Sequence, residues 1–179
     1  MIQTVRDRYR ELTLLLIRRN ITISTMESCT AGQIASLLTD TEGASSVFRG
    51  AYVTYSNEAK IMAGVKADII EKYGVYSVQT SDAMASSCRH IFGTDIGIGI
   101  TGSFGNADPN NPDSIPGEVF FSIDTAKGTS HYRCSVPRQE TRLDYKLYIA
   151  GVVADRLLEL IALDCPDTLD CPDCTYTLY

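Results

Sequence analysis

Three side chains that could share a nucleophilic reaction lie close together in the sequence, between positions 43 and 60. They are Ser45, Tyr55 and Lys60, all within GASSVFRGAYVTYSNEAK. A serine hydroxyl needs a base to become a nucleophile, and the whole chain holds only two histidines. Where histidine is scarce, a lysine amine removed from water is the main remaining candidate for that base. This stretch is therefore the first place to look for chemistry.

Each of these residues also has an ordinary structural interpretation. Lys60 could lie on a solvated helix surface, Ser45 suits a turn or helix N-cap, and Tyr55 suits a half-buried strand. A dehydrogenase is an alternative, because short-chain dehydrogenases use serine with Tyr-x-x-x-Lys on one helical face. Here four residues separate Tyr55 from Lys60, and the first strand-to-helix junction reads ESCTAG, without the glycine-rich dinucleotide fingerprint. The dehydrogenase interpretation fails on both counts.

The elements that must position these residues alternate between strand and helix patterns. β-Branched or alternating apolar residues predict strands, and apolar residues at helical spacing predict helices. We expect strands at 21–26, 48–55, 94–102, 117–124 and 129–136, and helices ending near Asn20, at 30–39, near 56–64, at 66–74, 77–92 and 137–163. The long loop at 103–117 is a candidate functional segment. The alternation predicts an α/β fold with a central mixed sheet covered on both faces.

Composition narrows the class of protein. A chain of 179 residues fits one domain, which we place at 1–163, followed by a Cys-rich acidic tail at 164–179. A net charge of −6 argues against a nucleic-acid binder. The longest apolar runs are too short for a membrane span or a signal peptide, so we expect a cytoplasmic protein without a membrane partner.

The six cysteines fall into two groups. Cys29, Cys88 and Cys134 stand alone in segments that we expect to be buried, where a thiol behaves as a small hydrophobe. Cys165, Cys171 and Cys174 crowd the tail; they could bind zinc or form a redox pair, but a fourth zinc ligand is missing. In a reducing cytosol free thiols are the simpler interpretation, and we predict no metal site.

Several segments in consistent order, over about residues 5 to 160, carry a resemblance to a known family. MESCTAGQIASLLTDTEGAS, then YSNEAK, ITG and PGEVFFSI, resemble the C-terminal domain of the competence/damage-inducible protein CinA. That family includes nicotinamide-nucleotide amidases, which convert nicotinamide mononucleotide to nicotinate mononucleotide and ammonia. The resemblance implies a three-layer α/β/α sandwich around a mostly parallel, mixed sheet, a homodimer, and hydrolysis without a metal or cofactor.

The resemblance also implies roles for individual residues. By position, Ser45 becomes the nucleophile, Lys60 its base and Tyr55 an aid to proton transfer in an acyl-enzyme mechanism. The residues implied to bind the substrate are Ser28, Thr30, Asn57, Thr101 and Arg138. Ser28 and Thr30 would meet a phosphate or ribose at a helix N-terminus, and Arg138, paired with Arg142 at the start of the last helix, would hold the phosphate.

Two segments depart from the family pattern. Ala31 stands where relatives usually have glycine, a mild change at a close-packed junction. The loop at 103–117 lacks a glycine-rich run and holds Asp108 and Asp113, which would repel a phosphate if they faced it. The altered loop keeps an alternative open: a family member whose catalysis has lapsed and which binds a nucleotide or a protein partner.

Overall fold

The protein is described by a computed structural model that covers residues 1–106, 108–109, 111 and 114–164. Its elements are α1 (Ile2–Arg19), β1 (Ile23–Glu27), α2 (Gln33–Thr39), the 3-10 helix η1 (Ala44–Ser46), β2 (Phe48–Val53), α3 (Asn57–Met62), α4 (Ala67–Tyr73), α5 (Val78–Phe92), β3 (Ile96–Gly102), β4 (Glu118–Thr125), β5 (Gly128–Ser135) and α6 (Arg142–Asp164). Cys165, Cys171 and Cys174, for which a zinc or redox role was considered, lie outside the described residues.

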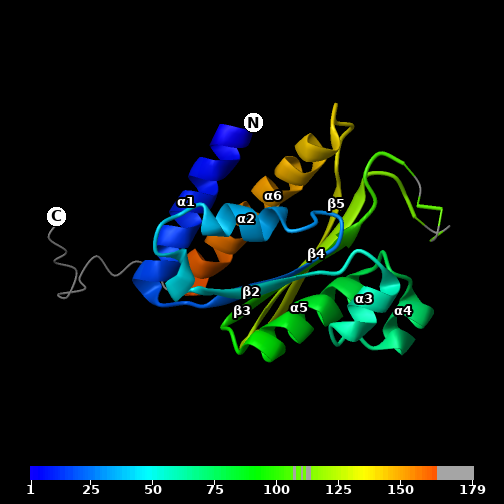
Figure 1. Cartoon of the computed structure of the whole chain (residues 1–179), viewed down its shortest axis with the longest axis horizontal. Coiled ribbons are helices and arrows are strands. Elements are labelled where there is room, and N and C mark those ends of the chain that lie inside the picture. Colours follow the sequence, from blue (N-terminus) through cyan, green and yellow to red (C-terminus); the bar gives the residue numbers. More distant parts are fainter. Residues whose placement is uncertain (107, 110, 112–113, 165–179) are drawn as a thin grey trace, which may run out of the picture.

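The five strands form one mixed sheet in the order β2-β1-β3-β4-β5. β1 runs parallel to both β2 and β3, whereas β4 pairs antiparallel with β3 and with β5. Helices α1, α2 and α6 cover one face, and α3, α4 and α5 cover the other (Figure 1). The predicted α/β fold, with three layers around a mixed sheet, is confirmed.

Each face of the sheet has its own apolar core. The larger core packs one stripe of α1, α2 and α6 against the sheet, and its fully buried members include Leu12, Leu16, Ile98 and Leu157. The smaller core joins β1 to α5 through Met26, Met84 and Cys88. Burial of these side chains removes apolar surface from water, which holds the three layers together.

Two glycines of β3 bring α5 onto the bare backbone of the strand. Gly97 and Gly99 face the helix, and a Cβ atom at either position would overlap the backbone of Ala85. The sequence predicts that one side of this Ile/Gly strand admits a close approach, and the structure identifies the approaching group as α5. Ile96, Ile98 and Ile100, which alternate with these glycines, belong to the larger core.

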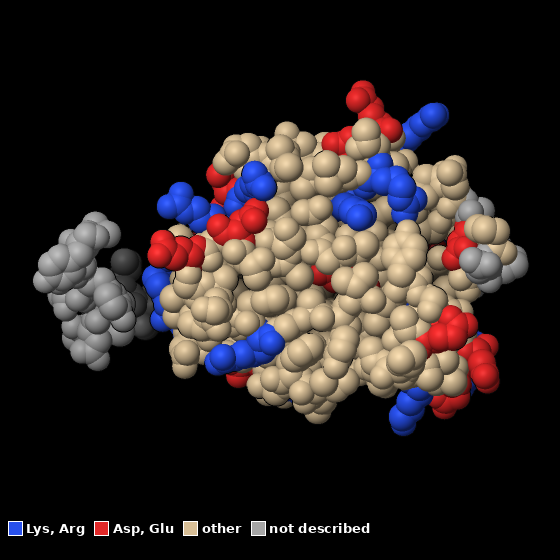
Figure 2. Space-filling model, viewed as in Figure 1, with Lys and Arg blue, Asp and Glu red and all other residues tan. Residues whose placement is uncertain are grey.

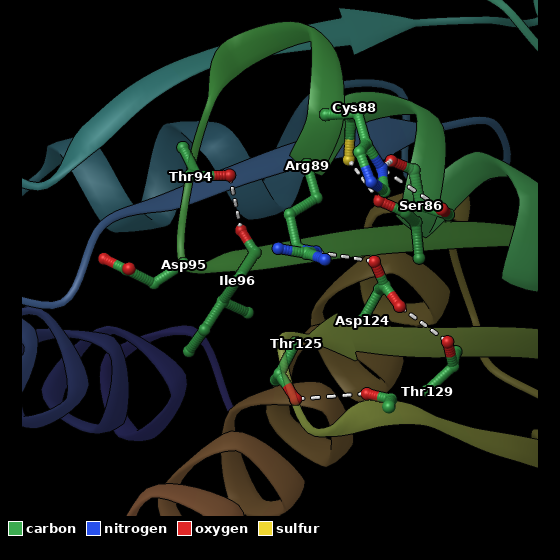
Figure 3. A network of polar contacts seen from close by, with 12 residues as sticks. Ser86, Cys88, Arg89, Thr94, Asp95, Ile96, Asp124, Thr125 and Thr129 are labelled. Carbon is green, nitrogen blue, oxygen red and sulfur yellow. Dashed lines mark hydrogen bonds and ion pairs between the residues drawn. The ribbon is translucent and has the colours of Figure 1, made fainter.

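A polar network fixes the C-terminal half of α5 to the antiparallel strands. Arg89 donates from Nε to Oδ2 of Asp124 at 2.7 Å, and the Thr129 hydroxyl donates to the other oxygen of that carboxylate at 2.6 Å. Figure 3 shows this chain of contacts running from α5 through β4 to β5. Because Asp124 is almost buried and its charge is paired, the network favours one register of helix against sheet.

Two helix starts differ from the prediction, each for a local reason. The last helix begins at Arg142 because Thr141 caps it, with the Asp144 N–H donating to the Thr141 hydroxyl at 3.1 Å. Arg138 therefore lies in the preceding loop and not on the helix. Helix α2 begins at Gln33, after Ala31 and Gly32 have adopted positive φ of 51° and 86°.

Candidate active site

Lys60 is the buried cation at the centre of the site. Its side chain is only 1% exposed, and its Nζ donates to Oγ of Ser28 at 3.0 Å and to the carbonyl of Thr54 at 2.9 Å. Ser56 caps α3 by accepting from the Ala59 N–H, so Lys60 lies in the first turns of the helix. Helical side chains point toward the N-terminus, which directs this amine back to the end of β2.

Burial makes a neutral Lys60 amine, the form that can accept a proton, more abundant near neutral pH than in an ordinary lysine. Burial disfavours its charged form and lowers the pKa of the amine from 10.5 to about 8, although the negative charges of Asp108 and Glu58 act in the opposite direction. An appreciable fraction of the amine is therefore neutral near pH 7.5. The interpretation of Lys60 as a solvated surface lysine is wrong, because its amine is buried and desolvated.

Ser28 is the hydroxyl that the structure brings to this base. It follows the last residue of β1 directly, and its N–H donates to the carbonyl of Ile100 on β3 at 3.0 Å. Ser28 lines a cavity of about 290 Å³ together with Tyr55, Tyr76, Arg142 and residues of the loop after β3. The Ser28 hydroxyl thus contacts the buried amine of Lys60 and also borders a cavity large enough for a ligand.

The expected pairing of Ser45 with Lys60 is wrong. Ser45 is exposed in η1, before β2 begins, whereas Lys60 reaches the carbonyl of Thr54 after β2 has ended. The six residues of β2 span about 17–20 Å, so these two side chains lie at opposite ends of the strand. Ligands of α/β sheets bind at the carboxyl ends of strands, and that rule, applied to β1, points to Ser28.

Cys29, the next residue to the nucleophile candidate, is not a competing nucleophile. Burial, and then the charge of Glu27, raises the pKa of its thiol to about 12. The thiol therefore stays protonated at physiological pH, and thiols react as thiolates. Cys88 is buried as expected, and Cys134 is half-buried.

Tyr55 lies at the mouth of the cavity and is 63% exposed, so it is not a half-buried strand residue. Its hydroxyl oxygen accepts a hydrogen bond from Nη2 of Arg142 at 3.1 Å. The same guanidinium lies 5.7 Å from the ring centroid of Phe104. The structure therefore brings Tyr55 to the site through an arginine at the start of α6.

The N-terminus of α2 does not provide the anion site that the sequence suggested for Ser28 and Thr30. The fully buried carboxylate of Glu27 accepts from the N–H groups of Ile34 at 3.1 Å and Ala35 at 2.8 Å. A carboxylate that already caps the helix occupies its amides and repels a phosphate. Thr30 is fully buried, and its hydroxyl has no hydrogen-bond partner among the described residues.

Ala31 is a larger departure than the addition of one methyl group. Its φ of 51° is left-handed, a conformation that glycine adopts freely and that strains other residues. The strain lies in the turn between Ser28 and α2, so it borders the site directly.

The other predicted contacts divide between the cavity and its surroundings. Thr101 is fully buried and donates its hydroxyl to the Val75 carbonyl at 3.1 Å, so it supports the site and does not line it. Asn57 donates from Nδ2 to Oδ1 of Asn111, at 3.4 Å, and so meets the loop after β3. Arg138 lines a second depression of about 660 Å³, which shares Phe104, Asn106 and Arg142 with the cavity at Ser28.

Within the part of the chain that the structure describes, no group of three or more histidine, cysteine or acidic residues could hold a metal ion. No helix in that part is long and apolar enough to cross a membrane. On the face in Figure 2, acidic and basic side chains are intermixed, and most of its middle is uncharged.

Comparison with known proteins gives a consistent result. The model of the CinA C-terminal domain family matches residues 6–157. A CinA-like protein of Flavobacterium psychrophilum is 39% identical over 131 residues, which cover 70% of this chain and 31% of the relative. Another, from Shewanella denitrificans, is 35% identical over 148 residues, covering 82% of this chain and 34% of the relative. The chain spans about a third of the length of these curated relatives.

Solved structures share the fold. A CinA superfamily protein from Klebsiella pneumoniae has a TM-score of 0.82 at 21% identity, with 89% of this chain and 98% of that chain covered. The competence/damage inducible protein of Agrobacterium tumefaciens has a TM-score of 0.77 at 26% identity, with 87% and 94% covered.

Proposed function

Because the chain belongs to the CinA C-terminal domain family, we propose that it is an amidase that hydrolyses nicotinamide mononucleotide to nicotinate mononucleotide and ammonia. The observation that carries the proposal is the 3.0 Å contact between Nζ of Lys60 and Oγ of Ser28. A hydroxyl held against a buried amine, at the edge of a cavity, is the arrangement that serine–lysine acyl transfer requires. Ser28 thus takes the role that the sequence assigned to Ser45.

In the first half of the reaction, neutral Lys60 accepts the Ser28 proton as Oγ attacks the carboxamide carbon. The C–N bond of the tetrahedral intermediate then breaks, Lys60 returns the proton to the departing nitrogen, and ammonia leaves. The negative charge on the intermediate needs N–H donors, and losing one such donor costs about 10²–10³ in rate. We assign these donors to the turn that follows Ser28 directly, apart from Ala31, whose N–H already donates to the Ser28 carbonyl at 3.1 Å.

In the second half, a water molecule attacks the ester formed on Ser28. Lys60, neutral again, accepts a proton from that water and passes it to the Ser28 oxygen as the ester C–O bond breaks. The carboxylic acid product then releases its proton to solvent and leaves as the carboxylate. The base that activates the nucleophile therefore also activates the water, so one buried amine serves both half-reactions.

The two adjoining hollows suggest how the substrate lies. The carboxamide and its ring would occupy the cavity at Ser28, and the phosphate would extend into the larger depression lined by Arg138 and Arg142. Guanidinium groups match phosphate oxygens in geometry as well as in charge. A homodimer, a cytoplasmic location and activity without a metal or cofactor stay predictions.

An ammonia-release assay with nicotinamide mononucleotide tests the proposal. Ser28→Ala and Lys60→Ala should each lower kcat by about a thousandfold or more, since each removes one half of a cooperating pair. Ser45→Ala is the matched control and should keep the wild-type rate. Loss of activity in Ser45→Ala with retention in Ser28→Ala would overturn the assignment, and absence of ammonia from wild type would reject the amidase function.

The alternative is a member that binds a nucleotide without turning it over. The half-buried carboxylate of Asp108 on the cavity wall favours it, because this charge opposes a phosphate there. The buried Lys60–Ser28 contact counts against it, because burying an amine costs stability that simple binding would not require. Thermal stabilisation by the mononucleotide without ammonia release would select this alternative.

A further inference from the structure

Asp108 contributes an acidic side chain to the wall of the cavity that contains Ser28. It belongs to the loop after β3, the segment in which this chain departs from the family pattern. Its negative charge is felt at Lys60, where it acts against the lowering of the amine pKa. Because the carboxylate lines the same cavity as Ser28, a ligand bound there would lie beside it.

Neighbouring groups hold this carboxylate in place. The Tyr76 hydroxyl donates to Oδ2 of Asp108 at 2.6 Å, and Nδ2 of Asn111 donates to the same oxygen at 2.7 Å. The Asp108 N–H donates to Oγ of Ser114 at 2.7 Å. Both donors to Oδ2 stabilise an ionised carboxylate, and the Tyr76 contact also connects the loop to the segment before α5. These hydrogen bonds hold the negative charge of Asp108 at a fixed position on the cavity lining.

Arg142 brings the opposite charge to the same cavity, from the start of α6. A ligand that complements both side chains carries an anionic group near Arg142 and a cationic group near Asp108. The negative charge of Asp108 also repels an anion close to Ser28, so a phosphate would bind nearer to Arg138 and Arg142.

We propose that Asp108 determines specificity by selecting substrates whose ring is cationic beside the amide to be cleaved. The proposal rests on the proposed amidase function and deepens it. In a pyridinium carboxamide, the ring charge lies within one ring width of the carbon that Ser28 attacks. A cavity of about 290 Å³ that receives the amide therefore also receives the charge. The reduced mononucleotide has the same phosphate and amide but an uncharged dihydropyridine ring.

The experiment compares the two mononucleotides in wild type and in Asp108→Asn. The measured quantity is the ratio of kcat/KM for the oxidised form to kcat/KM for the reduced form. Removing one unit charge roughly 6 Å from another in a partly hydrated site should lower this ratio about tenfold. Each protein acts as its own control, because any change in Lys60 or in folding affects both substrates.

Glu58→Gln is the matched control. Glu58 is exposed, and its charge also acts on Lys60, but it does not line the cavity. Its removal should leave the ratio within about twofold of wild type. An unchanged ratio in Asp108→Asn, or an equal fall in Glu58→Gln, would overturn the role of Asp108.

Binding measurements separate this inference from the proposed function. In the Ser28→Ala background, calorimetry should show that Asp108→Asn weakens binding of the oxidised form about tenfold more than binding of the reduced form. If binding shows this selectivity but wild type releases no ammonia, the role of Asp108 is supported and the amidase function is rejected. If wild type releases ammonia but Asp108→Asn weakens binding of both forms equally, the amidase function is supported and the role of Asp108 is rejected.

Discussion

Replacing Lys60 with methionine tests two consequences of the buried amine separately: its cost to the stability of the fold and its role as the base in catalysis. Methionine has a similar length and no charge, so it can fill the same space in an apolar environment. The variant loses the base and two hydrogen bonds, to the Ser28 hydroxyl and the Thr54 carbonyl. We expect it to be inactive and, at neutral pH, more stable than wild type.

The magnitude follows from the pKa of the amine. A fall from 10.5 to about 8 is a cost of roughly 3 kcal/mol for keeping Lys60 charged in the folded protein. Leaving the Thr54 carbonyl without its donor returns about 1 kcal/mol of that. The net gain near pH 7 is therefore roughly 2 kcal/mol, or a rise in Tm of about 4–8 °C for a domain of this size.

The gain should depend on pH in a defined direction. Between pH 8 and 10.5 the unfolded chain binds a proton at Lys60 that the folded protein has released, so wild-type stability rises with pH across this window. Lys60→Met has no such group. Its advantage should therefore be full below pH 8 and vanish at about pH 10, where the remaining charge cost equals the lost hydrogen bond. At higher pH the variant should be less stable than wild type by up to about 1 kcal/mol.

Urea unfolding of both proteins at pH 7, 8.5 and 10, with reductant present, measures this difference directly. Subtracting the two free energies of unfolding removes the titration of tyrosines and thiols that both proteins share. A difference that stays constant over this pH range would refute the link between burial and basicity. Ammonia release by the variant would refute the role of Lys60 as the base.

Three further predictions concern the same site and its support. Ala31→Gly should raise the free energy of unfolding by about 1 kcal/mol, because glycine adopts φ near 51° without strain; thermal unfolding would show no gain if the turn were relaxed. Wild-type kcat/KM should rise with pH through about 8 as Lys60 loses its proton, and a profile that is flat from pH 6.5 to 9 would contradict this. Gly99→Ala should destabilise the fold by about 1–3 kcal/mol, since the new Cβ overlaps the backbone of α5; a neutral effect in urea unfolding would mean that the helix can move away freely.

Local patterns predicted most of the fold. The β-branched run before Ser28 and the Ile/Gly alternation before Gly102 both formed strands of the central sheet. The start of α6 was missed, because helical periodicity extends through Arg138, whereas the Thr141 cap decides where the helix begins. Caps and positive φ are properties of single residues, which averaged patterns do not resolve.

The sequence identified residues of the candidate site, but it paired Lys60 with the wrong serine. Lys60 and Tyr55 were found because their segment is distinctive, and Ser28 was placed among the substrate contacts. Ser45 was chosen as the nucleophile by carrying the family's serine over by position, within a stretch singled out because Ser45 and Lys60 lie close in sequence. That closeness does not hold in space, because the whole length of β2 separates the two residues.

Glu27 caps α2 from seven and eight residues away, and that contact depends on the turn at Ala31 and Gly32. The role proposed for Asp108 depends on its contact with Tyr76, 32 residues away in the sequence, which no local pattern encodes.

The contact between α5 and the glycines of β3 has a consequence for how this protein could be re-engineered. Tyr76 lies on the cavity wall two residues before α5 begins, so the position of this wall follows the spacing between helix and sheet. That spacing is set by backbone against backbone at Gly97 and Gly99, where a larger residue displaces the helix. Substitutions that alter the packing of α5 on the sheet would therefore disturb the cavity. Substitutions in the loop that carries Asp108 could change substrate preference without disturbing that packing.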